Sequence, residues 1–326
     1  MRQHFKTFAT FFAVLLTYGC AGMDEMPDNS LAGHSPILLS TGSVERAARV
    51  AKPEGMHNDF KVYAAFRQAG TPTEVMNGYA VTYNGSFWDY ESPSQPLQFW
   101  KRDADDYLFT AGAPVASVES IDLQSLTLHM QHNLTASDLY SHPLRIGAAD
   151  PEFGKTVNLH FAYAHCRVGV AFIKDSETDV TLSDIRLTPS APVTSEAYMT
   201  FAFNWNTLTA SPSLLTPVAT DGSPLAFDPV TIPKNTATAQ ASATRHYCIP
   251  DTSNPTGWTV SLTCDGEDKS ASFVNEHTWE SGKNYLYVFS LTANVPKLVK
   301  VIVQDDYFDC NDIGSGGSFS DTDMTE

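Results

Sequence analysis

The sequence has few charged residues and especially few positive ones. Only 17% of its 326 residues are charged, and 20 lysines and arginines face 37 aspartates and glutamates, which gives a formal net charge of −17. Such a surface repels nucleic acid and anionic membranes, so we exclude nucleic acid as a partner. Hydrophobic residues make up 42% and aromatic residues 11% of the chain, which suits a folded protein with a large core.

The motifs of common enzymes and metal sites are also missing. No GxSxG elbow, P-loop or GxGxxG fingerprint occurs, and no two cysteines have the CxxC spacing. His129 and His132 stand three residues apart, which on a strand points their rings to opposite faces. Asp103, Asp105 and Asp106 lack the glycine and distal glutamate of an EF-hand, so we expect a solvated hairpin turn there. The sequence predicts no enzyme, metal or cofactor.

The apolar run at residues 8–16 is too short to span a bilayer, which needs roughly 20 residues. It follows a positively charged start and precedes Gly19 and Cys20, the order of a removable secretory signal. Cleavage between Gly19 and Cys20 would free Cys20 for acyl chains such as palmitate, and two or three chains give stable anchoring. We therefore expect a lipoprotein signal peptide over 1–19, a flexible tether over 20–34 and a surface-exposed protein on the outer membrane. A plain secretion signal with an incidental cysteine is the alternative.

The remaining cysteines leave the redox state open. An oxidising envelope would allow three pairings of these four residues, and the alternative is a set of buried thiols. They are Cys166, Cys248, Cys264 and Cys310.

Apolar and polar residues alternate along most of the chain, and a sustained apolar stripe of period 3.6 is absent. Residues 285–291 are apolar on both faces, which predicts a central strand, and 298–303 form the last strong strand. Proline and glycine interrupt these runs at short spacing, as in β-sandwiches. The sequence therefore predicts an all-β fold. Other predicted strands cover 60–66, 126–130, 157–161, 168–172, 199–205 and 258–264.

A loop between Tyr140 and Gly154 is the predicted domain boundary, because it is rich in proline and glycine and has strand runs on both sides. We predict an N-terminal β-sandwich over 35–150 and a C-terminal β-sandwich over 151–313. Residues 314–326 are glycine, serine and acidic residues, which indicates a mobile acidic tail.

Several stretches in a fixed order resemble the fimbrillins of Bacteroidota. SFWDYESPSQPLQFWKRDADDYLFTAGAP resembles the family's tryptophan hairpin and the strands that follow it, up to its Phe-x-Ala-x-x-Pro element. ASDLYS and VNLHFAYAHCRVGVAFI resemble its central segment, and GKNYLYVFSL resembles its late strand. The resemblance implies two tandem transthyretin-like β-sandwich domains of Greek-key type, and a fimbrial (pilus) subunit or fimbrial accessory protein that serves cell adhesion with other fimbrial subunits.

The resemblance also implies a maturation route. In the fimbrillin family an Arg-directed, trypsin-like protease removes the first strand, and a donor strand from a neighbouring subunit fills the groove. Residues 36–39 match the first strand, and Arg46 and Arg49 follow it as candidate cleavage sites. The alternative is that these arginines are ordinary surface residues and the candidate donor strand an ordinary core strand. The candidate donor residues are Leu298, Val299, Val301 and Val303.

The position of this subunit in a fibre and its binding partner stay open in the sequence. No alternating apolar segment follows Ile313, which favours a tip or accessory subunit over a main stalk subunit. The alternative function is a monomeric outer-surface lipoprotein that binds glycan or host protein. Trp88, Trp100 and Trp205 would suit stacking on sugars, but their place in alternating apolar runs favours core packing.

Overall fold

The computed structural model describes residues 35–41, 55–122, 127–133, 138–204, 208–251 and 255–305. Over these ranges the regular secondary structure is almost wholly β-strand, and the helical content is the 3-10 turn η1, Val115–Ser117. The predicted all-β fold is confirmed. No helix in these ranges is long and apolar enough to cross a membrane. The predicted signal peptide with Gly19, the tether with Cys20 and the tail over 314–326 lie outside the described residues.

A seven-stranded sheet carries the first hydrophobic core on one of its faces. Its strands are β2 (Asp59–Gln68), β3 (Thr71–Tyr83), β4 (Trp88–Asp89), β5 (Asp106–Ala113), β8 (Leu139–Ser141), β9 (Leu144–Gly147) and β11 (Phe161–Tyr163). They lie in the order β11-β8-β5-β2-β3-β4, and β9 also pairs with β5. The predicted alternation of β2 is confirmed, because Phe60, Val62 and Phe66 all point into this core and are at most 2% exposed.

A small parallel sheet and a non-regular segment cover the first core. The sheet consists of β1 (Leu39–Thr41) and β10 (Val157–Leu159). The segment at 90–104 contributes Tyr90 and Trp100, which are at most 5% exposed. On packing alone the first core extends to Tyr163, and the division of the chain between residues 150 and 151 stays a prediction.

Two further sheets face each other around the second hydrophobic core. One contains β12 (Cys166–Ile173), β18 (Gln240–Ala241), β19 (His246–Cys248), β22 (Lys283–Thr292) and β23 (Val295–Asp305). The other contains β13 (Val180–Pro189), β16 (Leu225–Phe227), β17 (Val230–Ile232), β20 (Gly257–Cys264) and β21 (Glu267–Val274). The strand β22 lies between β12 and β23 and buries both of its faces, which confirms the predicted central strand.

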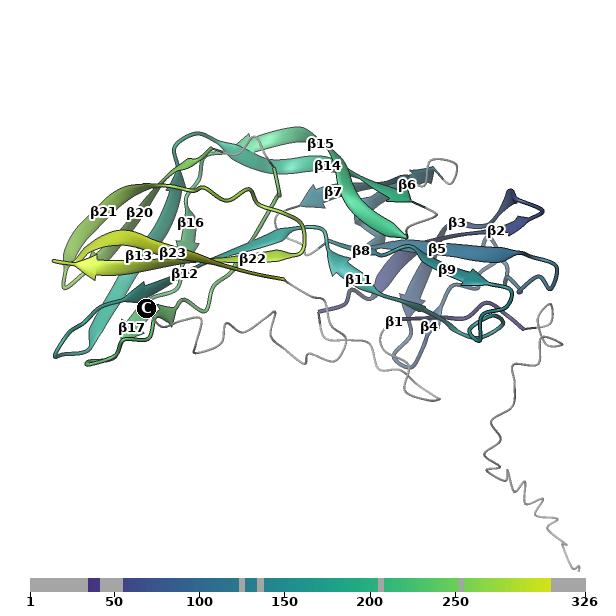
Figure 1. The fold of residues 1–326 in the computed structure, drawn as a ribbon, viewed down its shortest axis with the longest axis horizontal. Coiled ribbons are helices and arrows are strands. Elements are labelled where there is room, and N and C mark those ends of the chain that lie inside the picture. Colours follow the sequence, from purple (N-terminus) through teal and green to yellow (C-terminus); the bar gives the residue numbers. More distant parts are fainter. Residues whose placement is uncertain are drawn as a thin grey trace, which may run out of the picture.

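A fourth large sheet joins the two halves of the chain. It contains β6 (Val118–Asp122), β7 (Thr127–Asn133), β14 (Val193–Asn204) and β15 (Thr209–Asp221) in the order β15-β14-β7-β6. Figure 1 shows the long β14–β15 hairpin reaching from the second sandwich over the sheet of the first core. There Phe201 stacks on Tyr140 with ring centroids 4.3 Å apart, and Met199, Tyr63 and Leu108 bury the same contact.

The acidic turn at 103–106 is only partly solvated. Asp103 and Asp105 are exposed, as predicted, but Asp106 is 3% exposed at the start of β5. Its carboxylate accepts a 2.7 Å hydrogen bond from Arg67 Nε and lies 3.0 Å from Arg145 Nε. The expectation of a solvated residue was wrong here because two arginines, from β2 and β9, neutralise the buried charge.

Three of the four cysteines that follow Cys20 are buried free thiols: Cys166, Cys248 and Cys264. Burial raises the pKa of Cys248 to about 12, which keeps this thiol protonated and unreactive at neutral pH. Cys310 lies outside the described residues.

Replacement of Phe201 by alanine tests whether the β14–β15 hairpin holds the two halves together. Phe201 is fully buried, so Phe201→Ala is expected to lower the free energy of unfolding by about 3–5 kcal/mol, as measured by urea denaturation. Phe87→Ala is the matched control, because Phe87 is 56% exposed and its loss is expected to change stability by about 0.5 kcal/mol or less. Equal losses of unfolding free energy in the two variants would contradict the idea that the hairpin holds the two halves together.

Candidate functional site

The first strand is inserted between two segments that are distant in sequence. At its start, Pro36 forms an antiparallel bridge with Phe99, and Ile37 N donates to Gln98 O at 2.8 Å. At its end, β1 pairs in parallel with β10, beginning with Val157 N donating to Leu38 O at 2.8 Å. Residues 35–41 therefore close the first unit by linking 98–100 to 157–159.

Most side chains of this strand are buried. Ile37 and Leu39–Thr41 are at most 5% exposed, whereas Leu38 is 47% exposed. Ile37 and Leu39 belong to the first hydrophobic core, which also contains the rings of Trp100 and Phe153. Full burial of an aliphatic side chain contributes roughly 1.5–3 kcal/mol. Ile37 and Leu39 therefore supply much of the free energy that keeps the strand packed on the core.

Polar contacts fix the register of the strand. Tyr90 Oη donates to Ile37 O at 2.8 Å and accepts from Gln98 N at 3.2 Å, so one hydroxyl ties the strand to its antiparallel neighbour. Burial raises the pKa of Tyr90, which keeps its hydroxyl protonated as a donor. Ser40 Oγ donates to Asn158 Oδ1 at 3.1 Å across the parallel pair. Thr41 Oγ1, although buried, has no hydrogen-bond partner in the described part of the chain.

Only the segment at 42–54 connects this strand covalently to the rest of the folded chain. The structure describes no residue between Thr41 and Gly55, so the candidate cleavage sites Arg46 and Arg49 lie outside the described residues. By connectivity alone, a cut at either arginine would leave residues 35–41 held to the first unit by non-covalent contacts.

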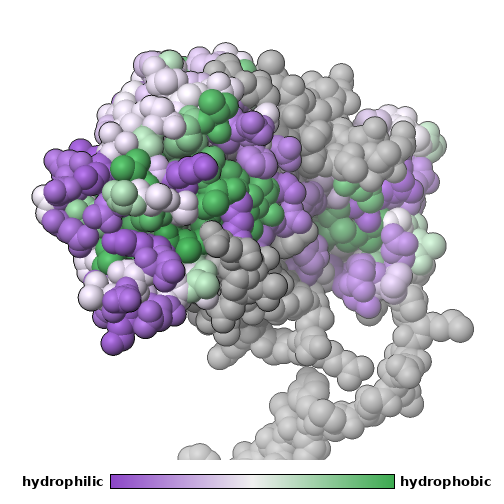
Figure 2. All heavy atoms as spheres, turned by 60° about the vertical axis from the view of Figure 1, so that its left-hand side comes forward, coloured by the Kyte–Doolittle hydropathy of each residue, from purple (hydrophilic) through white to green (hydrophobic). Residues whose placement is uncertain are grey.

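The candidate donor residues lie on β23, at the edge of a sheet of the second sandwich. Leu298 and Val301 pack against the second core, and β23 pairs with β22 along its length. Val299 and Val303 are 46% and 40% exposed, and Figure 2 shows apolar residues at the surface of this half among hydrophilic ones. The structure does not bring β23 and β1 together, because they belong to different sheets.

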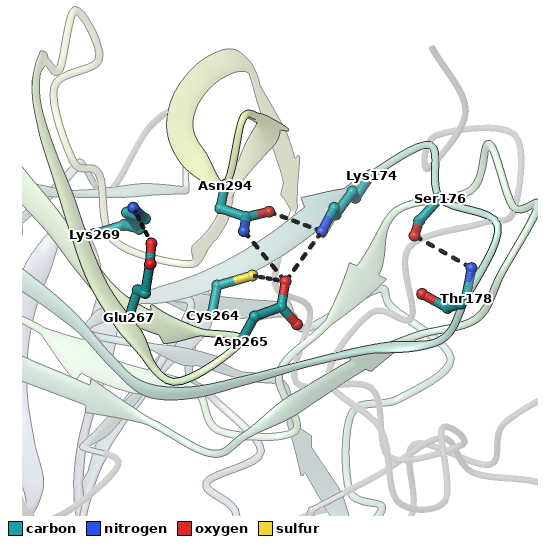
Figure 3. Close-up of polar contacts among 8 residues, drawn as sticks. All are labelled: Lys174, Ser176, Thr178, Cys264, Asp265, Glu267, Lys269 and Asn294. Atoms are coloured by element: carbon teal, nitrogen blue, oxygen red, sulfur yellow. Dashed lines mark hydrogen bonds and ion pairs between the residues drawn. The ribbon is translucent and has the colours of Figure 1, made fainter.

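The turn that precedes β23 is hydrogen-bonded to both sheets of the second sandwich. Asn294 in this turn accepts a 2.8 Å hydrogen bond from Lys174 Nζ and donates to Asp265 Oδ2 at 3.2 Å (Figure 3). Lys174 Nζ also lies 3.8 Å from Asp265 Oδ2. Release of β23 would therefore break a network that joins the ends of β12, β20 and β22.

The other residues singled out from the sequence do not assemble a reactive site. Trp88 and Trp100 are core residues, as predicted, and Trp205 lies outside the described residues. His129 Nδ1 lies 3.4 Å from the hydroxyl of Thr200 on the neighbouring strand. Within the described ranges no three histidine, cysteine or acidic side chains are placed to hold a metal ion. No local pattern in the sequence predicted the parallel pairing of β1 with β10, which joins residues more than one hundred positions apart.

Replacement of Thr41 and of Ser40 tests the buried hydroxyl of Thr41 and the Ser40–Asn158 hydrogen bond at the end of the strand. Thr41→Val removes a buried hydroxyl that has no partner among the described residues, and it is expected to raise the free energy of unfolding by about 1 kcal/mol. Ser40→Ala removes the bond to Asn158 and is expected to lower it by about 1 kcal/mol. Urea denaturation midpoints compare the two variants, and a destabilised Thr41→Val protein would contradict the geometry described.

Comparison with known proteins gives one family. Among curated proteins no match is found. The chain is similar in structure to a candidate cell adhesion protein from Bacteroides ovatus (14% identity, TM-score 0.48, 83% of this chain and 96% of that one). It is also similar to the tip fimbrial protein Mfa3 from Porphyromonas gingivalis (12% identity, TM-score 0.38, 79% of this chain and 97% of that one). The fimbrial anchor protein Mfa2 from the same organism is similar as well (9% identity, TM-score 0.31, 84% of this chain and 98% of that one). A family model described as fimbrillin-like matches residues 48–305, so the chain belongs to the fimbrillin-like family.

Proposed function

We propose that this chain is a fimbrial subunit that accepts a strand from a neighbouring subunit in place of its own first strand. It is exported as a lipoprotein anchored through Cys20 to the outer membrane, and an Arg-directed protease then cuts at Arg46 or Arg49. Family membership supports a structural protein of a surface fimbrium and not an enzyme. Its partners are other fimbrial subunits.

The observation that carries this proposal is the way in which β1 is held. The strand is short, lies at the N-terminal end of the described chain and fills a slot between residues 98–100 and 157–159. Its loss would leave unpaired backbone groups on both sides of the slot and an opening to the first core. Main-chain pairing and alternate side-chain pockets are the two features by which a donor strand is recognised.

The first unit is more stable with a strand in the slot than with the slot empty. Burial of Ile37 and Leu39 together contributes about 3–6 kcal/mol, which is a large part of the 5–15 kcal/mol that stabilises a typical domain. Cleavage alone would therefore leave β1 in place, and a partner strand with better side-chain complementarity would replace it. A donor strand needs large aliphatic residues at the positions of Ile37 and Leu39.

A tip or accessory position fits this chain better than a stalk position. A stalk subunit both accepts and donates a strand, whereas a tip subunit only accepts one. The candidate donor strand β23 packs on the second core and is fastened at its first turn by Asn294, Lys174 and Asp265. These contacts favour its retention in the second sandwich.

Controlled cleavage tests the proposal. The purified full chain is treated with an Arg-directed protease and mixed with candidate pilin subunits, and SDS-resistant oligomers are expected on gels. A double variant, Arg46→Ala with Arg49→Ala, is expected to stay uncut in this segment and monomeric. Arg102→Ala, at an exposed arginine of the first unit, is the matched control and is expected to assemble.

Two results would count against the proposal. One is a protein that has lost residues 35–41 yet stays monomeric with every candidate subunit. The other is equal assembly by the cleavage-resistant double variant and the cleaved chain.

A further inference from the structure

We propose that Cys166 and Cys248 form a disulfide when the chain folds in an oxidising compartment, and that this bond locks β19 to β12. The inference goes beyond strand exchange and rests on the proposed function only for export of the chain to the cell envelope. An oxidising envelope is where structural disulfides form and persist. The sequence alone leaves three pairings of the four cysteines open, and the geometry of the second sandwich favours one of them.

The two cysteines stand directly opposite each other on neighbouring antiparallel strands. In the register of β12 and β19, Cys166 pairs with Cys248. Directly opposite residues of an antiparallel pair have Cα atoms about 4.5 or 5.5 Å apart, and a disulfide spans about 4.4–6.8 Å between Cα atoms. The backbone therefore already holds the two residues at a separation that a disulfide can bridge.

Both side chains point to the same face of the sheet. Cys166 is fully buried, Cys248 is 5% exposed, and both belong to the second hydrophobic core. Tyr247, the residue before Cys248, packs instead against the first core. The thiol of Cys166 leans across the strand pair, since its Sγ donates to Cys248 O at 3.3 Å. Burial raises the pKa of Tyr287, and both thiols raise it further, which places the two sulfur atoms near one hydroxyl.

The third buried thiol lies at the other end of the second sandwich. Cys264 Sγ donates to Asp265 Oδ2 at 3.7 Å, and this carboxylate oxygen lies 3.8 Å from Lys174 Nζ (Figure 3). Lys174 follows the last residue of β12, whereas Cys166 is the first. The strand has eight residues, which span roughly 25 Å. Cys264 is therefore too distant to pair with Cys166 or Cys248.

The bond would form by thiol–disulfide exchange with a small disulfide such as oxidised glutathione, or with a disulfide-bearing oxidoreductase of the envelope. The thiolate of one cysteine attacks a sulfur of the oxidant and releases one thiol, and the second thiolate attacks the mixed disulfide and releases the other. The two cysteines lose two protons and two electrons, and the oxidant is reduced to two thiols. Burial raises the pKa of Cys248 to about 12, so the exchange takes place during folding, before β19 closes onto β12.

The disulfide would secure the point at which the chain passes from the first sheet to the second sandwich. The strand β11 ends at Tyr163, and β12 begins three residues later at Cys166. Within the described part of the chain, the three-residue strand β19 pairs only with β12. Its Tyr247 ring lies 6.2 Å from the ring of Tyr163. A bond from Cys248 to Cys166 would keep β19, and with it Tyr247, in place at this junction.

Refolding of the purified full chain from urea tests the pairing, with oxidised glutathione in one sample and a reducing agent in the other. After digestion with trypsin and a protease that cuts before aspartate, the oxidised protein is expected to yield peptide 156–167 linked to peptide 246–250. The two cysteines are 82 positions apart, so the bond closes a long loop, and the Tm of the oxidised protein is expected to exceed that of the reduced protein by about 5–10 °C.

Single alanine variants connect the bond to these readouts. Cys166→Ala and Cys248→Ala are each expected to abolish the linked peptides and the difference in Tm between oxidised and reduced samples. Cys264→Ala is the matched control, because it removes a buried thiol of the same core and is expected to keep both. Comparison of the oxidised and reduced samples of one variant separates loss of the bond from loss of packing.

Three results would overturn the proposal. They are the absence of the 156–167 to 246–250 linkage after oxidative refolding, a main product in which Cys166 or Cys248 is linked to another cysteine, and equal Tm values for the oxidised and reduced unmodified chain. Strand exchange is scored separately, by oligomer formation after cleavage, so failure of the disulfide and failure of the proposed function are distinguished.

Discussion

The burial of Ile37 and Leu39 against the first core is the contact on which the first unit depends. These side chains come from a strand that has one antiparallel and one parallel neighbour, both brought there by distant parts of the chain. Their removal would open the core between Trp100 and Leu159. A fold completed by the first strand of its described residues is well suited to a change of partner, because one cut in the connecting segment would leave that strand held by non-covalent contacts alone.

The rest of the molecule is held by contacts that do not involve the first strand. The β14–β15 hairpin pairs with β7 and packs Phe201 on Tyr140, on the face of the seven-stranded sheet opposite to β1. The second sandwich has a core of its own, and Asn294, Lys174 and Asp265 fasten the turn that starts its last strand. Under the proposed strand exchange, the second unit would therefore keep its own core and stay folded.

Local sequence patterns predicted the strands but not their long-range pairing. Alternation in β2 and the two-sided apolar run of β22 identified both strands, because each pattern is set by burial of the strand itself. The pairing of β1 with β10 and of β14 with β7 joins segments far apart in sequence, and no local pattern encodes it. The burial of Asp106 was missed for the same reason, since its partner arginines come from β2 and β9.

Hydrogen exchange in residues 35–41 shows whether a donor strand replaces the first strand. Strand replacement predicts strong protection in the intact chain, continued protection after cleavage alone, and loss of this peptide from the protein once a donor subunit is bound, as followed by mass spectrometry. Retention of a protected 35–41 segment in the assembled complex would contradict it, because the slot would then still hold the original strand.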